Sequence, residues 1–175
     1  MVADVDRKKL FERLSASLID FGQARFCARH LLKKGWHSMP WERRPSRGTI
    51  YEQQNAFVTN LIVAYARPFT KSKGWPSFPS ELINFDSEQQ EIHQRIILKR
   101  HQIFAHSDSE HYSFEPWTFG AFRTTIESVP SAILSAEETT RIEKMTENLI
   151  AATVKKLDEL YKELAVSPDD VDVAI

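Results

Sequence analysis

Apolar side chains recur every three or four residues along four stretches of the chain, the spacing that forms one buried stripe on an α-helix. The first stretch covers residues 5–34, and Gly35 follows it as a suitable residue to end a helix. The second begins near Thr49, which precedes Glu52 by the three residues of a capping box. It must end before Pro68, because a proline disfavours helical backbone in the residue before it.

The second half of the chain contains the other two stretches. Asp86 or Ser87 is placed to cap a helix that continues to about Ala105. Ser135 and Glu138 have the spacing of another capping box, and a long periodic stretch follows them. The pattern therefore predicts four helices.

Between the third and fourth helices, aromatic and polar residues alternate over residues 107–134. This alternation is typical of short strands, and a lid packed on the helices is the favoured interpretation of its aromatic side chains. The predicted fold is mostly α, an antiparallel bundle of four long helices with a short irregular or β-like segment before the last helix. One domain is expected over residues 1–166, followed by an acidic flexible tail over residues 167–175.

Composition excludes several classes of protein. Only 5 of the 175 residues are glycine, and neither GxGxxG nor GxxxxGK[ST] occurs, so the glycine loops of dinucleotide-binding folds and P-loops are missing. No serine or cysteine nucleophile motif is present. Cys27 is the single cysteine, and no apolar run approaches the 18 residues of a membrane span. A cytoplasmic protein without membrane contact is expected.

Charge is distributed unevenly along the chain. The formal net charge is -1, but the first 50 residues contain 11 lysines and arginines against 5 acidic residues. Residues 137–175 contain 5 basic against 10 acidic residues. Two interpretations are open: the basic part faces RNA or another phosphate-bearing molecule, or the two ends neutralise each other in the fold.

A basic side chain interrupts the apolar stripe of the third helix. Counting about 100° per residue from Ile92, the buried arc extends past Ile96 at about 40° to Ile97 at about 140°. Arg100, at about 80°, and His93, at about 100°, fall inside this arc. A guanidinium there needs a partner, because an unpaired buried charge costs several kcal/mol. The partner is either a carboxylate from another helix or a bound molecule.

Arg100 also begins the run RHQIFAHSD, in which five residues separate it from His106. An arginine, a polar residue (here His101), a short spacer and a histidine form the signature of the HEPN superfamily of helical bundles, which this segment resembles. The sequences FAHSD (104–108) and YARPF (65–69) are similar to those of its abortive-infection, phage-defence branch. The resemblance covers most of residues 5–164.

The resemblance implies either a metal-independent endoribonuclease or an RNA- or nucleotide-binding protein. In both cases it implies a homodimer without a cofactor, in a defence or toxin-antitoxin type system in which an antitoxin is a candidate partner. It makes His106 the general base or acid at the ribose 2′-hydroxyl, Arg100 the group that stabilises charge on the phosphorus centre, and His101 a supporting residue. These roles suit the chemistry, because histidine exchanges protons near neutral pH and arginine offers a planar set of donors to a phosphate. The additional residues predicted to contact RNA or a nucleotide are His93, Asp108, Arg67, Arg43 and Arg44.

Other interpretations of the same residues stay open. His106, Asp108 and His111 have the chemistry of metal ligands but no standard spacing, so no metal site is predicted. Arg67 precedes Pro68, and its side chain is placed to bind the carbonyl groups at the end of the second helix, which is a structural role. The alternative function is a non-catalytic helical dimerisation or interaction module.

Overall fold

The computed structural model of the chain describes residues 2–37, 47–105, 113–128 and 133–164. Its long elements are the helices α1 (Val2–Lys34), α2 (Arg47–Ala66), α3 (Ser87–Lys99) and α4 (Ala136–Leu164), and the strands β1 (Ser113–Phe119) and β2 (Phe122–Ser128). Three short helical turns complete it: η1 (Arg67–Phe69), η2 (Ser80–Leu82) and η3 (Arg100–Ala105). The predicted fold class, mostly α with a β-like segment before the last helix, is confirmed. The acidic tail predicted over residues 167–175 lies outside the described residues.

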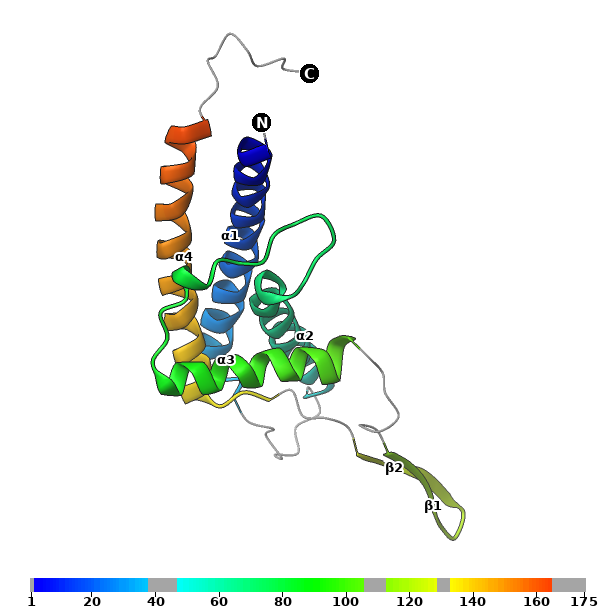
Figure 1. Ribbon diagram of the computed structural model, residues 1–175. Coiled ribbons are helices and arrows are strands. Elements are labelled where there is room, and N and C mark those ends of the chain that lie inside the picture. The colour runs from blue at the N-terminus through cyan, green and yellow to red at the C-terminus, as the bar shows by residue number, and fades with distance from the viewer. Residues whose placement is uncertain (1, 38–46, 106–112, 129–132, 165–175) are drawn as a thin grey trace, which may run out of the picture.

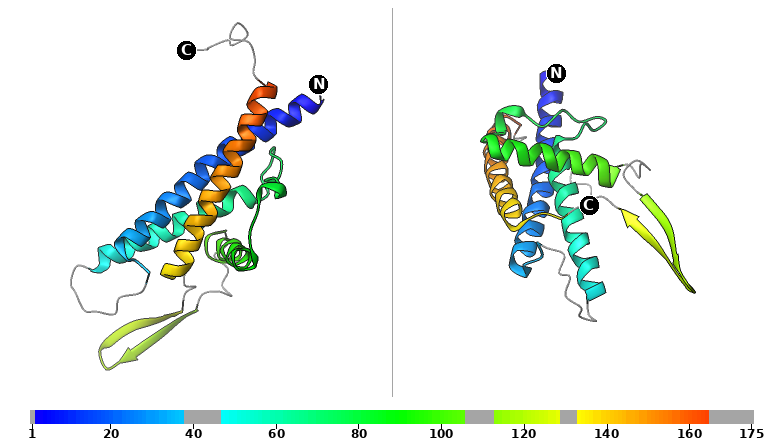
Figure 2. Two further views of the ribbon diagram at one scale, coloured as in Figure 1. Left: turned by 90° about the vertical axis from the view of Figure 1, so that its left-hand side faces the viewer. Right: turned by 90° about the horizontal axis from the view of Figure 1, so that it is seen from below.

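Three of the helices lie side by side, with α1 between α2 and α4 (Figures 1 and 2). Both neighbours run antiparallel to α1. The helix α3 lies across this layer and contacts α2 and α4 (Figure 1). None of the described helices combines the length and the apolar character needed to span a membrane.

The core forms where these helices face one another. Side chains from α1, α2, α3 and α4 contribute to it, and the largest fully buried ones include Phe21, Leu61, Tyr65, Ile96 and Met145. Ile92 and Ile96 are the buried positions of α3, as its periodicity predicts.

Local sequence signals explain most helix ends. The Asp86 side chain accepts a hydrogen bond from Gln89 N at 2.8 Å, and the Gln89 side chain accepts one from Asp86 N at 3.2 Å. Ser135 and Glu138 form the second predicted capping box, with bonds of 3.1 and 2.7 Å. The cap predicted at Thr49 is wrong, because α2 already begins two residues earlier.

Gly35 ends α1 as predicted. Its φ of 65° is a left-handed value that glycine adopts without strain. Gly35 N donates to Leu32 O at 3.1 Å and Trp36 N donates to Leu31 O at 3.0 Å. These two bonds form a Schellman motif, which satisfies carbonyl groups that the last turn of α1 would otherwise leave free.

Ion pairs between α1 and α4 account for part of the uneven charge distribution. The pairs are Arg7–Glu163 at 3.4 Å, Arg25–Glu147 at 2.6 Å and Arg29–Glu143 at 2.6 Å. Each joins a basic side chain of the first helix to an acidic side chain of the last. The basic and acidic ends therefore neutralise each other along this interface, and the charge distribution alone does not indicate an RNA-binding face.

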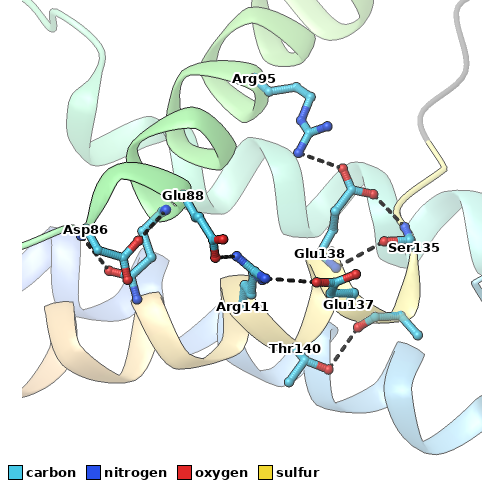
Figure 3. A network of polar contacts seen from close by, with 10 residues as sticks. Asp86, Glu88, Arg95, Ser135, Glu137, Glu138, Thr140 and Arg141 are labelled. Atoms are coloured by element: carbon cyan, nitrogen blue, oxygen red, sulfur yellow. Dashed lines mark hydrogen bonds and ion pairs between the residues drawn. The ribbon is translucent and has the colours of Figure 1, made fainter.

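A polar network fixes the start of α3 to the start of α4 (Figure 3). Arg141 on α4 donates to Glu88 on α3 and, at 2.8 Å, to Glu137 on its own helix. Arg95 on α3 pairs with Glu138 on α4 at 3.0 Å. The network holds α3 across α4, and Arg100 follows the other end of α3, at the start of η3.

The strands β1 and β2 form an antiparallel hairpin that projects away from the helices (Figures 1 and 2). Its two-residue loop contains Gly120, whose φ of 60° suits a tight hairpin turn. Every side chain described over residues 113–126 is exposed, including Trp117. The prediction of strands is confirmed, whereas the prediction of a lid is wrong, because the hairpin buries none of its described aromatic side chains against the helices.

Candidate functional site

A cavity of about 460 Å³ opens where α1, the end of α2 and the start of η3 meet. Nine described residues line it: Arg13, Asp20, Arg67, Thr70, Lys71, Ser72, Trp75, Arg100 and His101. We call it the basic cavity, because four of these side chains are lysine or arginine and one is acidic. The residues come from four places in the sequence, which the crossing of α3 over the other helices brings together.

Arg13 forms the inner wall of the basic cavity and is 3% exposed. Its Nη2 donates to the carbonyl oxygens of Arg67, Pro68 and Thr70, at 3.3, 2.5 and 3.1 Å. These carbonyls follow the end of α2, where a helix leaves its acceptors free and partly negative. Burial lowers the pKa of Arg13, and the nearby charge of Asp20 acts in the opposite direction. Arg13 therefore holds the 67–70 segment in place.

Arg67 stands at the mouth of the basic cavity with its side chain 55% exposed. As predicted, α2 ends before Pro68, and a short helical turn begins at Arg67. The guanidinium of Arg67 donates to Asp20 Oδ1 at 3.2 Å. The role of binding carbonyls at the end of α2, predicted for Arg67, belongs to Arg13.

Asp20 is the acidic residue among those that line the basic cavity. Burial raises the pKa of its carboxyl group, while the hydrogen bond from Arg67 and the charges of Arg67 and Arg13 lower it. Asp20 thus accepts a hydrogen bond from Nη1 of Arg67 and reduces the positive charge of the cavity.

Arg100 begins the π-helical turn η3, which continues α3. Its side chain is half-buried, and Nη1 lies 3.3 Å from Nδ1 of the exposed His101. No carboxylate of the described residues forms an ion pair with Arg100. Its half-buried side chain lines the basic cavity. Both partners considered for this arginine, a carboxylate and a bound molecule, stay predictions. The change from α- to π-helical backbone at this position is a feature often found at functional sites.

His93 lies outside the residues that line the basic cavity. Its Nδ1 is 3.0 Å from the Tyr65 hydroxyl, and its ring packs edge-on against Phe69 at 4.6 Å and beside Phe85 at 5.4 Å. Burial lowers the pKa of His93 and raises that of Tyr65. These contacts give His93 a place in the core next to η1, and its predicted contact with a substrate stays a prediction.

Four predicted site residues, His106, Asp108, Arg43 and Arg44, lie outside the described residues. The structure brings together Arg67, Arg100 and His101. Within the part of the chain that the structure describes, no group of three His, Cys, Asp or Glu residues is arranged to hold a metal ion.

Sequence analysis missed Arg13, although a signal for it was present. Arg13 precedes the buried Leu31 by 18 residues, which is five complete turns of an α-helix, so the two side chains leave α1 in the same direction. Arg100 was identified as a basic residue within the buried arc of its helix. The same search along the first helix would have found Arg13. Trp75 and Lys71, in the loop after η1, have no such periodic signal.

The chemistry of the basic cavity suits an anion. Its lining includes Arg67 and Lys71, at and after the end of α2, and Arg100 with His101 at the start of η3. Guanidinium groups bind phosphate through pairs of hydrogen bonds, and the hydroxyl of Ser72 can add a further donor. The cavity can therefore hold a phosphate group between η1 and η3.

Comparison with known proteins finds no matching family model, no similar curated protein and no similar solved structure. The likeness to the HEPN superfamily thus depends on the two short motifs, RHQIFAHSD and YARPF.

Proposed function

We propose that this protein binds RNA in the basic cavity and cleaves it as a metal-independent endoribonuclease of the HEPN type. The observation that carries the proposal is that Arg67 and Arg100, from the two motifs of the resemblance, line one cavity although 33 positions separate them. Neither motif predicts this proximity by itself. Two arginines that converge on one opening favour a ligand with phosphate groups.

The charge of the cavity supports the same ligand. Arg13 is occupied with backbone carbonyls, but Arg67, Lys71 and Arg100 all have polar groups at the opening. The backbone of RNA supplies a phosphate at every nucleotide, and basic side chains gain affinity by displacing its counterions.

In the proposed reaction, the 2′-hydroxyl of a ribose attacks the adjacent phosphorus. A bond forms between O2′ and phosphorus, the bond from phosphorus to O5′ breaks, and the products are a cyclic phosphate and a 5′-hydroxyl. His106 either takes the proton of the 2′-hydroxyl as general base or gives one to O5′ as general acid, and water exchanges the other proton. Arg100 stabilises the negative charge on the phosphate oxygens, and His101, hydrogen-bonded to Arg100, supports its orientation.

The resemblance also supplies the setting that we propose. The protein acts in the cytoplasm as a homodimer, in a defence or toxin-antitoxin system with an antitoxin as its partner. Asp108, Arg43, Arg44 and His93 are proposed to contact the RNA.

The test is cleavage of an end-labelled single-stranded RNA in the presence of EDTA. We expect the wild-type protein to cleave, Arg100→Ala and His106→Ala to lose cleavage, and Arg95→Ala to retain it. Arg95 is a matched control because it lies on α3 but pairs with Glu138, away from the cavity. Equal cleavage by all four proteins would refute the proposal. Binding without cleavage, weakened by Arg100→Ala, would retain the RNA site and replace the nuclease with a binding module.

A further inference from the structure

Trp75 is the feature of the basic cavity that phosphate binding does not explain. A phosphate needs cations and donors, yet an indole ring, 41% exposed, lies among them. Large apolar side chains are normally buried, since exposing one forfeits a favourable transfer from water. An exposed aromatic ring at the edge of a charged cavity indicates a ligand that has a flat apolar part.

The ring of Trp75 is held in a defined position. The guanidinium carbon of Arg13 lies 5.5 Å from its ring centroid, so a buried cation covers one face of the indole. Pro76 fixes the backbone angle φ of the residue that follows Trp75. Further along the loop, the buried Phe78 packs edge-on against Phe21 and Phe69 at 5.5 and 5.4 Å. The exposed surface of Trp75 is therefore presented by an anchored loop.

The basic side chains and the aromatic side chain of the cavity wall together indicate the class of ligand. Arg67, Arg100 and Lys71 require an anion, and Trp75 offers a flat surface for stacking. A nucleotide carries a phosphate and a planar base within one residue, and bases stack on tryptophan regardless of their sequence. In a duplex, both faces of each base are already covered by neighbouring bases, so only a single strand can offer one to Trp75.

We propose that Trp75 is the stacking platform for a nucleobase of single-stranded RNA whose phosphate lies between Arg67 and Arg100. The inference rests on the proposed RNA-binding function and adds to it the strandedness of the substrate. Trp75 sets a preference for unpaired nucleotides and none for a particular base.

The test uses two ligands of equal length and equal phosphate number. One is a short single-stranded RNA with 2′-O-methyl groups, which prevent cleavage, and the other is its abasic counterpart. We expect Trp75→Leu to weaken binding of the base-containing strand by about 5- to 100-fold, the range for one lost stacking contact. Binding of the abasic strand should not change. Trp75→Phe keeps a ring over Arg13, so its affinity for the base-containing strand should lie between those of Trp75→Leu and the wild type.

Trp117 provides the matched control, because it is 43% exposed on a hairpin that projects away from the helices. Trp117→Leu should bind both strands like the wild type, and a folded duplex of the same sequence should bind the wild type more weakly than the single strand. Circular dichroism melting confirms that each variant is folded.

The outcomes separate the two proposals. If Arg100→Ala weakens binding of both strands while Trp75→Leu changes neither, RNA binding stands and the stacking platform is refuted. If Trp75→Leu weakens both strands equally, Trp75 acts only by packing on Arg13, and the inference also fails. If neither strand binds, or if Arg100→Ala has no effect, the proposed function fails and the inference fails with it.

Discussion

Asp20 and Arg67 form a hydrogen bond of 3.2 Å across the mouth of the basic cavity, between α1 and the turn that follows α2. The side chain of Asp20 is 17% exposed and that of Arg67 is 55% exposed, so the acidic partner is the more buried of the two. Asp20 occupies one nitrogen of the Arg67 guanidinium and offsets part of its positive charge. Asp20 therefore limits the affinity of the cavity for anions.

Asp20→Asn should increase the affinity of the basic cavity for RNA. The amide keeps an oxygen for Arg67 but removes a negative charge beside the proposed phosphate, which is worth about 1 kcal/mol, or about fivefold in Kd, in this partly exposed setting. Fluorescence anisotropy with a labelled single-stranded RNA measures this change in Kd. Asp6→Asn makes the same chemical change about 21 Å away along α1 and should leave Kd unchanged. A weaker affinity for Asp20→Asn would show that Asp20 orients Arg67 more than it opposes the ligand.

Arg13→Met should destabilise the protein by about 2–4 kcal/mol. The variant loses charge-assisted hydrogen bonds to the carbonyls of the 67–70 segment and leaves these acceptors without that donor. Urea unfolding measures the change. Arg7→Met, on the same helix, removes an exposed pair with Glu163 and should cost less than about 1 kcal/mol. Equal effects of the two substitutions would mean that Arg13 does not anchor the segment.

The stability of the protein should fall as the pH drops below 6.5, in part because of His93. Burial lowers the pKa of His93 in the folded state below its unfolded value of 6.5. The unfolded state therefore takes up a proton first, and the stability present above pH 6.5 is lost as the pH falls toward the folded pKa. Urea unfolding between pH 5 and 8 should give a smaller pH dependence for His93→Gln than for wild type. His101→Gln, at an exposed position, serves as the comparison, and the same reduction in both variants would contradict the assignment.

Replacing the aromatic surface of the hairpin should leave the helices stable. Threonine at Trp117, Phe119, Phe122 and Ile126 removes side chains that are 43–74% exposed, so the helical melting transition should change by less than about 1 kcal/mol in total. Leu61→Ala, at a fully buried position of α2, should cost about 2–5 kcal/mol. Thermal unfolding, followed by circular dichroism at 222 nm, compares the stability of the two variants. A loss of several kcal/mol in the hairpin variant would mean that the hairpin does cover the helices.

Binding of single-stranded RNA should weaken as salt increases, and Arg67 should account for part of this dependence. Each phosphate neutralised contributes about -0.7 to the slope of log K against log salt. Arg67→Ala should therefore make the slope shallower by about 0.7. Arg95→Ala should keep the wild-type slope, because its side chain pairs with Glu138. An unchanged slope for Arg67→Ala would remove Arg67 from the RNA-binding surface.

The parts of the fold that the sequence predicts depend on residues close together in the chain. Asp86 caps α3 and Ser135 caps α4 through partners three positions away, and Gly35 ends α1 through its own backbone angle. Thr49 shows the limit of this approach, because a capping pattern of the right spacing lies inside α2. A short motif indicates which local contacts a residue is able to make. Whether the residue makes them depends on the rest of the fold.

The candidate site is less predictable because distant segments build it. The sequence places Arg67 at the end of a helix, but the donor that binds the carbonyls there comes from Arg13, 54 positions away. The exposure of the hairpin could not be predicted either, because alternating aromatic residues give the same sequence pattern whether or not they pack on a neighbouring element. Helical phase indicates which side of a helix is buried but not which segment of the chain covers it.

The pairing of α1 with α4 also has a consequence for the order of folding. The ion pairs Arg25–Glu147 and Arg29–Glu143 join residues 122 and 114 positions apart. During synthesis, α1 therefore leaves the ribosome long before its partner exists, and its apolar stripe stays partly uncovered until α4 has been made. Contacts of such high sequence separation slow folding and extend the time in which an unfinished chain is prone to aggregate. The helical layer is therefore completed only after α4 has been made, whereas the contacts of Arg13 and Asp20 with the 67–70 segment need only the first 70 residues.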